Sequence, residues 1–489
     1  MPIPTPGPGK PTWTPTALGA VSVLPGTGIP PTPPFIGFPD GPRQTPTPDP
    51  TRPPQATRAG VEEYQIQIGD TLGLIAQRYG LTVEDLVLAN DLLNPDILGV
   101  GDVLLIPVAS ANVVPGPGFK IIPNSELVYS PSSIGFAVQE FVVDRGGYLL
   151  GYTEEVNGEL LTGPELVQLV AGRYSVNPRI LLAVLEYQSG WVTQFSPPES
   201  TLTYPMGRVE AAREGLFKQL SWAANQLNAG YYWWKAGAVS AWTFPDGETV
   251  RVHGGLNAGT AGVQHFFSEL YGRSDWEKIV SETGFVLTFE SLFGYSFQFA
   301  VEPLIPMVLT QPVLTLPIGH GKEWAFTGGP HGGWDTGSAW AALDLAPPAE
   351  AEGCTSSDEW VVASASGQIV RVGQGEVIQD LDGDGYEQTG WVLFYMHIEE
   401  RDRVSAGTYL QPGDRIGHPS CEGGFASGTH LHLARRYNGE WIAADGAIPF
   451  ILDGWVSTGT GREYDGFLVK GDVSIEACDC RADANTITR

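Results

Sequence analysis

The pattern of hydrophobic and polar positions along this chain changes near residue 59 and again near residues 110 and 301. Residues 1–58 hold 18 of the 40 prolines, interleaved with threonine and glycine. Such a composition favours extended polyproline conformations and does not supply the side chains of a packed core. We therefore expect residues 1–58 to form a disordered Pro/Thr-rich linker.

The next segment, residues 59–109, has the pattern of a compact strand, helix, helix, strand unit. Residues 64–68 alternate as a strand, and Gly69-Asp70-Thr71 turns the chain and caps a helix that ends at Tyr79. A second helix follows up to Ala89, and Val103 to Ile106 returns as a strand. The segment is long enough for one small domain of its own.

Two longer segments follow, and their patterns differ. In residues 110–300, Asn177-Pro178 is a favoured helix start, and the apolar run that follows is typical of a buried helix. Residues 301–456 instead contain short β-like runs separated by glycine, proline and aspartate turns, which indicate an antiparallel β domain. With residues 457–489 as a C-terminal extension, the chain is predicted to be a multidomain α+β protein.

Charge narrows the classes of partner. The 489 residues carry a formal net charge of −28 and a pI near 4.5, which argues against binding nucleic acid through a basic surface. The sequence has no run of 18 or more apolar residues, so we predict no transmembrane segment. The apolar stretch at residues 17–24 is too short for a signal peptide and lacks its basic start. Export must therefore be inferred from the domains.

Four cysteines allow two disulfides in an oxidising compartment. Cys354 and Cys421 each lie in a Gly/Ser-rich loop of the β segment, so we predict that they pair and hold loops beside a group of histidines. Cys478 and Cys480 are separated by one residue, too few for a zinc knuckle. Their pairing stays open.

Residues 59–109 resemble a LysM module. The resemblance is carried by Gly69-Asp70-Thr71, Asn90 and the closing strand, among other positions spread over about 45 residues. It implies binding of N-acetylglucosamine polymers such as peptidoglycan, in a groove lined by Gly69, Asp70, Thr71 and Asn90. The alternative for these four residues is that they only turn and cap the chain.

The helical segment resembles lysozymes and lytic transglycosylases around Glu186 to Trp191 and in the aromatic run 231–234. The resemblance implies a glutamate that protonates the glycosidic oxygen, but Gln188 stands at that position and an amide is no acid. Glu186 lies two residues earlier, roughly 200° around the helix axis. We therefore expect an inactive lysozyme-like domain, whose aromatic run fills a core or an interdomain contact.

The β segment resembles the M23 metallopeptidases of the lysostaphin and LytM type. The matching motifs are the strand that ends at His397, Gly413 to Gly417, and Thr429-His430-Leu431-His432. The resemblance implies that His432 binds zinc and that His397 and His430 form the catalytic pair. Residues 430 and 432 share one face of a strand, as a common site requires.

The remaining two ligands depart from the family spacing, which is a histidine four residues before an aspartate. Asp344 has the expected small residues and strand context, but the nearest upstream histidine, His331, is 13 residues away. The alternative pair is His331 with Asp335, which has the family spacing without the context. We favour His331 with Asp344, because ligands tolerate a longer loop provided that their atoms converge. His320 is a weaker candidate.

Three protein ligands would leave zinc a fourth position for water, whose pKa the ion lowers towards about 7. His430 and His397 would then exchange protons with this water and with the departing amine, because imidazole titrates near neutral pH. We read the other histidines outside this group, His253, His265 and His418, as core or turn residues.

A second metal is suggested by Asp380, Asp382 and Asp384, which alternate as at the start of a calcium loop. Position twelve is Trp391 rather than glutamate, so the loop is not an EF-hand. Calcium would need Glu387 or another carboxylate to finish its shell. The alternative is a solvated acidic turn.

Together these patterns predict an extracellular, cell-wall-associated zinc endopeptidase. It would hydrolyse amide bonds in the peptide crosslinks of peptidoglycan, with the LysM module holding it to the glycan. A non-catalytic wall-binding or regulatory protein that keeps a degenerate M23 scaffold is the alternative.

Overall fold

The computed structural model describes residues 61–66, 70, 72–79, 81, 83–90, 92, 101–107, 115–349 and 351–489. The proline-rich linker lies outside these residues, so its predicted character stays a prediction. None of the helices in the described part of the chain has the length and apolar character needed to cross a membrane.

The first described unit has the predicted order of strand, helix, helix and strand. Its elements are β1 (Glu62–Gln65), α1 (Leu72–Tyr79), α2 (Val83–Ala89) and β2 (Val103–Ile106). β1 and β2 pair antiparallel, with Tyr64 opposite Leu104. Ile75, Leu86 and Ile106 are fully buried between the helices and the strands, so the apolar positions of the sequence form the core of this unit.

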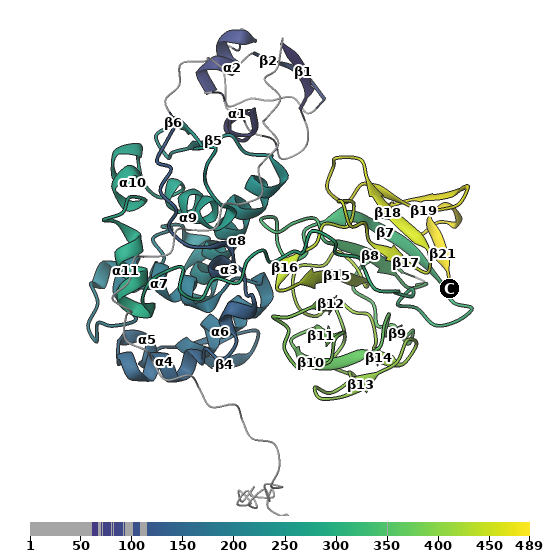
Figure 1. Cartoon of the computed structure of the whole chain (residues 1–489). Helices are drawn as coiled ribbons and strands as arrows, with labels where there is room; N and C mark the ends of the chain where they lie inside the picture. The colour runs from purple at the N-terminus through teal and green to yellow at the C-terminus, as the bar shows by residue number, and fades with distance from the viewer. Residues whose placement is uncertain are drawn as a thin grey trace, which may run out of the picture. The chain divides into compact units, whose positions relative to one another are not determined.

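Residues 115–300 form a helical half with two short hairpins (Figure 1). Its helices are α3 (Asn124–Leu127), α4 (Val138–Arg145), α5 (Tyr148–Gly151), α6 (Gly163–Tyr174), α7 (Pro178–Ser189), α8 (Leu216–Ala236), α9 (Ala258–Ser268), α10 (Arg273–Ile279) and α11 (Phe285–Phe293). The hairpins are β3 (Thr153–Val156) with β4 (Glu159–Thr162), and β5 (Ala241–Thr243) with β6 (Thr249–Arg251).

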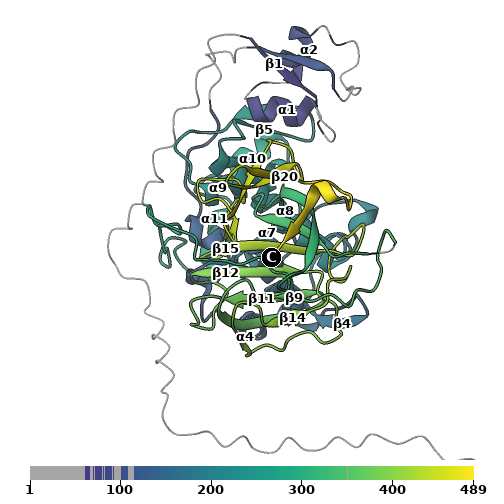
Figure 2. The ribbon, with the colours of Figure 1, turned by 90° about the vertical axis from the view of Figure 1, so that its right-hand side faces the viewer.

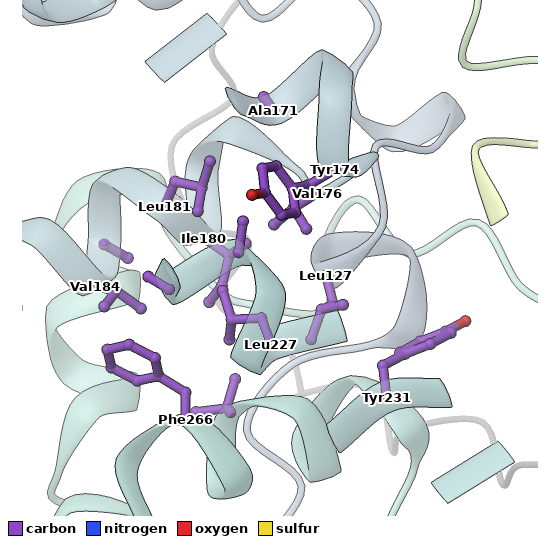
Figure 3. Close-up of a cluster of buried hydrophobic side chains, with 14 of the residues drawn as sticks. Leu127, Ala171, Tyr174, Val176, Ile180, Leu181, Val184, Leu227, Tyr231 and Phe266 are labelled. Carbon is purple, nitrogen blue, oxygen red and sulfur yellow. The ribbon is translucent and has the colours of Figure 1, made fainter. Parts of the chain in front are cut away.

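The helix predicted after Asn177 is confirmed as α7. The Asn177 side chain accepts a hydrogen bond from the Arg179 amide, and Pro178 occupies the first turn, where it needs no donor. Every residue from Pro178 to Leu185 is buried, so α7 is the central helix of this half. Figure 3 shows its Ile180 and Val184 gathered with Leu227 and Phe266 from neighbouring helices.

Residues 323–488 build one large antiparallel sheet and two smaller ones. The large sheet has the order β13, β10, β11, β12, β15, β8, β7, β21, and β16 pairs with β15 (Figures 1 and 2). Its strands are β7 (Glu323–His331), β8 (Ala342–Ala346), β10 (Gly367–Gly373), β11 (Glu376–Asp380), β12 (Trp391–Met396), β13 (Tyr409–Leu410), β15 (Leu431–Tyr437), β16 (Glu440–Trp441) and β21 (Thr486–Thr488). The smaller sheets contain β9 (Val361–Val362) with β14 (Arg415–Gly417), and β17 (Ile451–Leu452), β18 (Trp455–Gly459), β19 (Gly466–Lys470) and β20 (Val473–Glu476).

The two faces of the large sheet are buried in different cores, as alternation along a strand requires. Leu393 and Tyr395 of β12 face the core of the β half. Phe394 and Met396 of the same strand belong to the core of the helical half. The helices therefore pack against one face of the central strands of the sheet.

The contact between the halves contains buried charges that are paired. Arg173 of α6 binds Glu376, with Nε 2.5 Å from Oε1. Arg371 binds both Glu376 and Glu387, and Arg436 binds Glu387 at 2.8 Å. Because breaking one partner of a buried pair costs several kcal/mol, this network fixes how the two halves fit.

Part of the aromatic run 231–234 lies in the contact between the two halves. The sequence predicted that this run fills a core or an interdomain contact. The Tyr231 hydroxyl donates to Glu440 at 3.1 Å, and the Trp441 amide donates to the Tyr232 hydroxyl at 2.9 Å. Trp233 instead packs against His265 inside the helical half. The side chains that suggested sugar stacking are thus occupied by protein contacts.

The expected boundary between residues 456 and 457 falls inside β18. Past this point, β19 and β20 complete a four-stranded sheet, and β21 pairs with β7 at the edge of the large sheet. Residues 457–489 are therefore part of the β fold and not a separate extension. The sequence misled here because the family resemblance ends before this segment begins.

Candidate metal centre and active site

The three expected metal ligands meet where three neighbouring strands run side by side. His331 is the last residue of β7, Asp344 lies in the middle of β8, and His432 is the second residue of β15. His432 lies directly opposite Asp344 in the ladder. The register of β7 against β8 shifts twice between Phe326 and His331. The extra residues that separate His331 from Asp344 in sequence form the loop between the end of β7 at His331 and the start of β8 at Ala342.

The ligand atoms converge closely. His331 Nε2 lies 3.0 Å from His432 Nδ1, and Asp344 Oδ1 lies 3.2 Å from the first and 3.3 Å from the second. Asp344 Oδ1 is buried and accepts no hydrogen bond from the described residues. A buried carboxylate oxygen between two imidazole nitrogens needs a cation to offset its desolvation. The site therefore fits a divalent metal ion.

In both ligand histidines, the ring nitrogen outside the cluster hydrogen-bonds a backbone carbonyl. His331 Nδ1 lies 2.8 Å from the Gly329 oxygen, and His432 Nε2 lies 3.0 Å from the Gly333 oxygen. Donation of these N–H groups leaves the lone pair of the other nitrogen directed into the cluster. Two imidazole nitrogens and one carboxylate oxygen form a donor set typical of catalytic zinc.

The expected catalytic pair lies beside this cluster. His430 Nε2 is 3.8 Å from Asp344 Oδ1, and the rings of His397 and His430 are 4.4 Å apart. His397 Nδ1 contacts the Glu422 oxygen at 2.8 Å, and His430 Nδ1 contacts the Gly428 oxygen at 2.7 Å. In both rings Nδ1 makes the contact that orients the imidazole, so Nε2 remains available for proton transfer or hydrogen bonding.

The charges in the site follow from burial and from the neighbours. Burial alone would raise the pKa of Asp344, but the His331 and His430 imidazoles outweigh it and hold this pKa well below its usual value. Burial lowers the pKa of His397 to about 3. Burial also lowers the pKa of His432. His397 is therefore a neutral imidazole at neutral pH.

The alternative ligands lie elsewhere. Asp335 Oδ2 accepts a hydrogen bond from the Tyr174 hydroxyl at 3.1 Å, and its Oδ1 accepts one from the Thr336 amide. Neither oxygen of Asp335 joins the cluster formed by the three ligands. His320 is exposed in a turn. Convergence in space thus favours Asp344, as its strand context predicted.

Sequence reasoning missed Tyr464 and Glu463, which lie in the loop between β18 and β19. The Tyr464 ring stacks on His331 with centroids 4.2 Å apart and planes inclined by 17°. Glu463 accepts a hydrogen bond from the amide of Gly332, next to His331. Burial, followed by the charge of Asp344, raises the pKa of Tyr464 to about 12, so its hydroxyl keeps its proton. No motif marked these residues, because they fall in the segment taken as an extension.

The predicted disulfide joins Cys354 to Cys421, with 5.8 Å between the Cα atoms. Cys478 pairs with Cys480, which the sequence left open. The first bridge links two loops that border His397 and His430, as expected. The second lies near the start of the segment that leads into β21.

The acidic loop between β11 and β12 brings Asp380, Asp382 and Asp384 together. Backbone amides already donate to them: Asp380 Oδ2 accepts from Gly385 at 2.8 Å, and Asp384 Oδ1 accepts from Tyr386 at 2.9 Å. Glu387 does not complete a calcium shell, because its carboxylate pairs with Arg371 and Arg436. These contacts suit the alternative, an acidic turn, and calcium stays a prediction without support from Glu387.

The remaining histidines occupy core and turn positions as predicted. His265 is buried between Trp233 and Trp242, and burial lowers its pKa to about 3. His418 packs on Trp360, and its Nδ1 contacts the Glu359 oxygen. His253 accepts a hydrogen bond from Gly255 within a turn.

The carboxylate of Glu186 is engaged in hydrogen bonds within the helical half. Its Oε2 accepts hydrogen bonds from the amides of Val192 and Thr193, both at 3.0 Å, and so caps the turn that follows α7. Gln188 Oε1 accepts from the Tyr271 hydroxyl. This arrangement is consistent with the inactive domain predicted from Gln188.

In the predicted glycan site, Gly69 and Thr71 lie outside the described residues. Asp70 Oδ2 accepts a hydrogen bond from the Tyr64 hydroxyl at 2.8 Å. Asn90 donates to the Leu86 and Leu105 carbonyls and accepts from the Leu105 amide, which ties α2 to β2. Asn90 therefore has the structural role that was its alternative, and its contact with glycan stays a prediction.

Comparison with known proteins bears on three parts of the chain. The LysM domain model matches residues 64–107, and the model of the N-terminal domain of LasA matches residues 120–306. Protease LasA from Pseudomonas aeruginosa is 26% identical over 301 residues, which cover 58% of this chain and 68% of the relative. The resemblance to M23 metallopeptidases is confirmed.

Two further similarities concern the β half of this M23-like chain. Beta-lytic metalloendopeptidase from Lysobacter enzymogenes is 25% identical over 154 residues, which cover 31% of this chain and 83% of the relative. The solved structure of the M23 metalloprotease pseudoalterin is 23% identical to this chain. The match covers 34% of this chain and 96% of pseudoalterin, with a TM-score of 0.28. The lysozyme-like character of the helical half has no counterpart in these matches and stays a prediction.

Proposed function

We propose that the chain is an extracellular zinc endopeptidase that hydrolyses amide bonds in the peptide crosslinks of peptidoglycan. The observation that carries the proposal is the meeting of His331, Asp344 and His432 around a buried carboxylate oxygen that accepts no hydrogen bond from the described residues. His397 and His430 lie beside it in the order found in M23 peptidases. The relatives named a protease and a metalloendopeptidase support the same class of reaction.

In this proposal His331 Nε2, Asp344 Oδ1 and His432 Nδ1 hold the zinc. A bound zinc ion supplies Lewis acidity towards the scissile carbonyl and lowers the pKa of water at the site. The carbonyl oxygens of Gly329 and Gly333 keep the two imidazoles in the tautomer that binds metal. All three proposed ligands therefore lie on paired strands.

The remaining steps are assigned to His430 and His397, the pair outside the ligand set. His430 Nε2 lies 3.8 Å from Asp344 Oδ1, and 15% of the His430 side chain is exposed, so substrate can reach it. His397 lies against His430, but its pKa of about 3 makes it a poor proton acceptor, contrary to the expectation from the sequence. We therefore propose that the neutral His397 ring donates a hydrogen bond to the developing oxyanion, while His430 carries the proton to the departing amine. Tyr464 stays protonated and is a hydrogen-bond donor at the rim.

The LysM domain would hold the catalytic half close to its peptidoglycan substrate. Its family binds N-acetylglucosamine glycans, so a chain anchored to the glycan would meet peptide crosslinks at a high effective concentration. The strongly acidic composition is compatible with this, since the recognition does not depend on a basic surface. We propose the cell wall as the place of action on this ground.

The alternative is a non-catalytic wall-binding or regulatory protein. The unusual spacing of His331 and Asp344 favoured it in the sequence. The distance of 3.2 Å between His331 Nε2 and Asp344 Oδ1, on two paired strands, weakens that argument. What remains for the alternative is the packing of the helical half on the face of the sheet that bears the cluster.

One experiment separates the two. The full chain is purified, its zinc is measured by mass spectrometry of the metal, and crosslinked wall fragments are digested and weighed. The enzyme proposal expects about one zinc per chain and release of peptide products. His331→Ala should lose both, whereas the matched control His320→Ala, which changes an exposed histidine, should lose neither. Zinc-loaded protein that leaves every crosslink intact would support the alternative.

A further inference from the structure

The two histidines outside the ligand set are held by loops, unlike the metal ligands, which lie on paired strands. The backbone oxygen of His397 accepts hydrogen bonds from the Ser420 amide at 2.7 Å and from the Ser420 hydroxyl at 3.0 Å. The ring of the same histidine is oriented by the Glu422 oxygen. Residues 420–422 therefore hydrogen-bond both the backbone and the side chain of His397.

These hydrogen bonds matter because His397 has a left-handed backbone conformation, with φ of 64°. Residues other than glycine are strained there and keep that conformation only when their surroundings impose it. The strand β12 ends one residue earlier, at Met396, so ladder hydrogen bonds do not fix His397. The loop 420–422 is the element that does.

A second loop holds the residue next to His430. The Thr429 amide donates to the Gly353 oxygen at 3.1 Å, and the Thr429 hydroxyl accepts from the Thr355 amide and donates to the Thr355 oxygen. The His430 amide in turn reaches the Ser420 oxygen at 3.4 Å. His430, the residue just before β15, is thus held by Ser420 and, through Thr429, by residues 353–355.

Cys421 is the middle residue of the first loop and Cys354 is the middle residue of the second. Their disulfide joins the two loops across a sequence separation of 67 residues. We propose that this disulfide is a positioning element for His397 and His430, which fixes the pair relative to the metal cluster without contributing to metal binding. The inference rests on the proposed peptidase function.

The size of the effect follows from the sensitivity of proton transfer to geometry. Displacing a reacting group by about 1 Å can lower a rate by about 100-fold. Without the bridge the two loops can shift while β7, β8 and β15 keep their ladders. We therefore expect kcat to fall by roughly 10- to 100-fold, with KM changed by less than about threefold and the zinc content unchanged.

The test compares two double variants of the full chain. Cys354→Ala with Cys421→Ala removes the proposed positioning element. Cys478→Ala with Cys480→Ala removes the other disulfide, whose residues contact Phe326 and Asn485 and lie outside both loops. Zinc per chain, kcat and KM on a crosslinked peptide, and amide hydrogen exchange are measured for the parent and for both variants.

Hydrogen exchange supplies a readout that needs no activity. In the first variant the amides of Ser420 and Thr429 should exchange at least about tenfold faster than in the parent, while those of Leu433 and Leu345 in the central strands should not change. The control variant should leave Ser420, Leu433 and Leu345 unchanged; Thr429 does not serve in this comparison, because Arg481, next to Cys480, donates to its oxygen at 3.0 Å. Equal exchange and equal kcat in parent and first variant would overturn the proposal. Loss of zinc together with general faster exchange would also overturn it, because the bridge would then be an ordinary stabilising element.

Ser420→Ala provides a second route if the first variant does not fold. It keeps the disulfide but removes the hydroxyl that donates to the His397 oxygen. This variant should lower kcat by a smaller factor than the loss of the disulfide does, and it should keep its zinc. An unchanged kcat would again count against the proposal. A zinc-loaded parent without peptidase activity refutes the proposed function, and in that case the exchange data alone decide whether the bridge positions the two histidines.

Discussion

The ligand cluster of the β half and the core of the helical half use buried histidines in opposite ways. Around the metal cluster, each of the four histidines has one ring nitrogen oriented by a backbone oxygen and the other directed towards a neighbour. In the helical half, neither ring nitrogen of His265 has a hydrogen-bond partner among the described residues, and the ring lies between two tryptophans. The first arrangement preserves imidazole chemistry. The second uses imidazole as an aromatic filler.

The largest effect is expected from breaking the ligand set. Asp344→Asn keeps the shape of the side chain but removes the negative charge between His331 and His432. Zinc binding should weaken by more than about 100-fold, since even partners one shell further out contribute 10- to 100-fold. Titration with zinc against a competing chelator measures this change. Unaltered affinity would mean that the cluster does not hold the metal.

The next effect concerns the histidines outside the ligand set. His430→Ala should lower kcat by about 10²- to 10⁴-fold, because a positioned acid or base contributes that much. Zinc should remain at about one per chain, since the three ligand atoms are untouched. Steady-state kinetics and metal analysis on the same preparation check both statements. A parallel loss of zinc would place His430 among the ligands and contradict the division proposed for these residues.

His265 provides the test in the helical half. Burial lowers its folded-state pKa to about 3, whereas the unfolded chain has a histidine pKa near 6.5. As the pH falls through this window, the unfolded state binds a proton that the folded state does not, so stability decreases by about 1.4 kcal/mol per pH unit. His265→Phe should remove this loss and make the free energy of unfolding less dependent on pH between 6 and 4.

Urea unfolding followed by tryptophan fluorescence measures this dependence at each pH. The control is His320→Ala, because His320 is exposed and its replacement should leave the pH dependence of the parent. If His265→Phe were as sensitive to acid as the parent, the buried imidazole would not be the source of the acid sensitivity.

The smallest effect is expected at Glu186. Glu186→Gln keeps one oxygen for the amides of Val192 and Thr193 and should cost about 1 kcal/mol of stability. Release of reducing or anhydro sugars from glycan strands should not change. If the substitution abolished such release, Glu186 would be a catalytic acid and the helical half would be an active glycosidase.

Much of the fold was predictable from local patterns. The LysM elements and α7 followed from caps and periodicity, because Asn177-Pro178 and the apolar run after it specify a buried helix without help from distant residues. The strands with histidines were predictable for a similar reason, since alternation puts His430 and His432 on one face. The pairing of Cys354 with Cys421 followed from the composition of their loops.

Other features depend on contacts between distant segments and left no local signal. The covering of the sheet by the helices arises from pairs such as Arg173 with Glu376, about 200 residues apart in the chain. Tyr464 reaches His331 only because β18 and β19 fold back beside β7. The choice between Asp335 and Asp344 also needed the pairing of β8 with β7 and β15, which brings Asp344 beside both histidines. Single positions in a sequence do not report such long-range geometry.

The pairing of β21 with β7 has a consequence for association between chains. Thr486 to Thr488 pair with Glu323 to Ala325 and so cover the outer side of β7. An uncovered strand of this kind presents unpaired amide and carbonyl groups that can bind a strand of another molecule. We therefore expect β21 to protect this side of the sheet from aggregation.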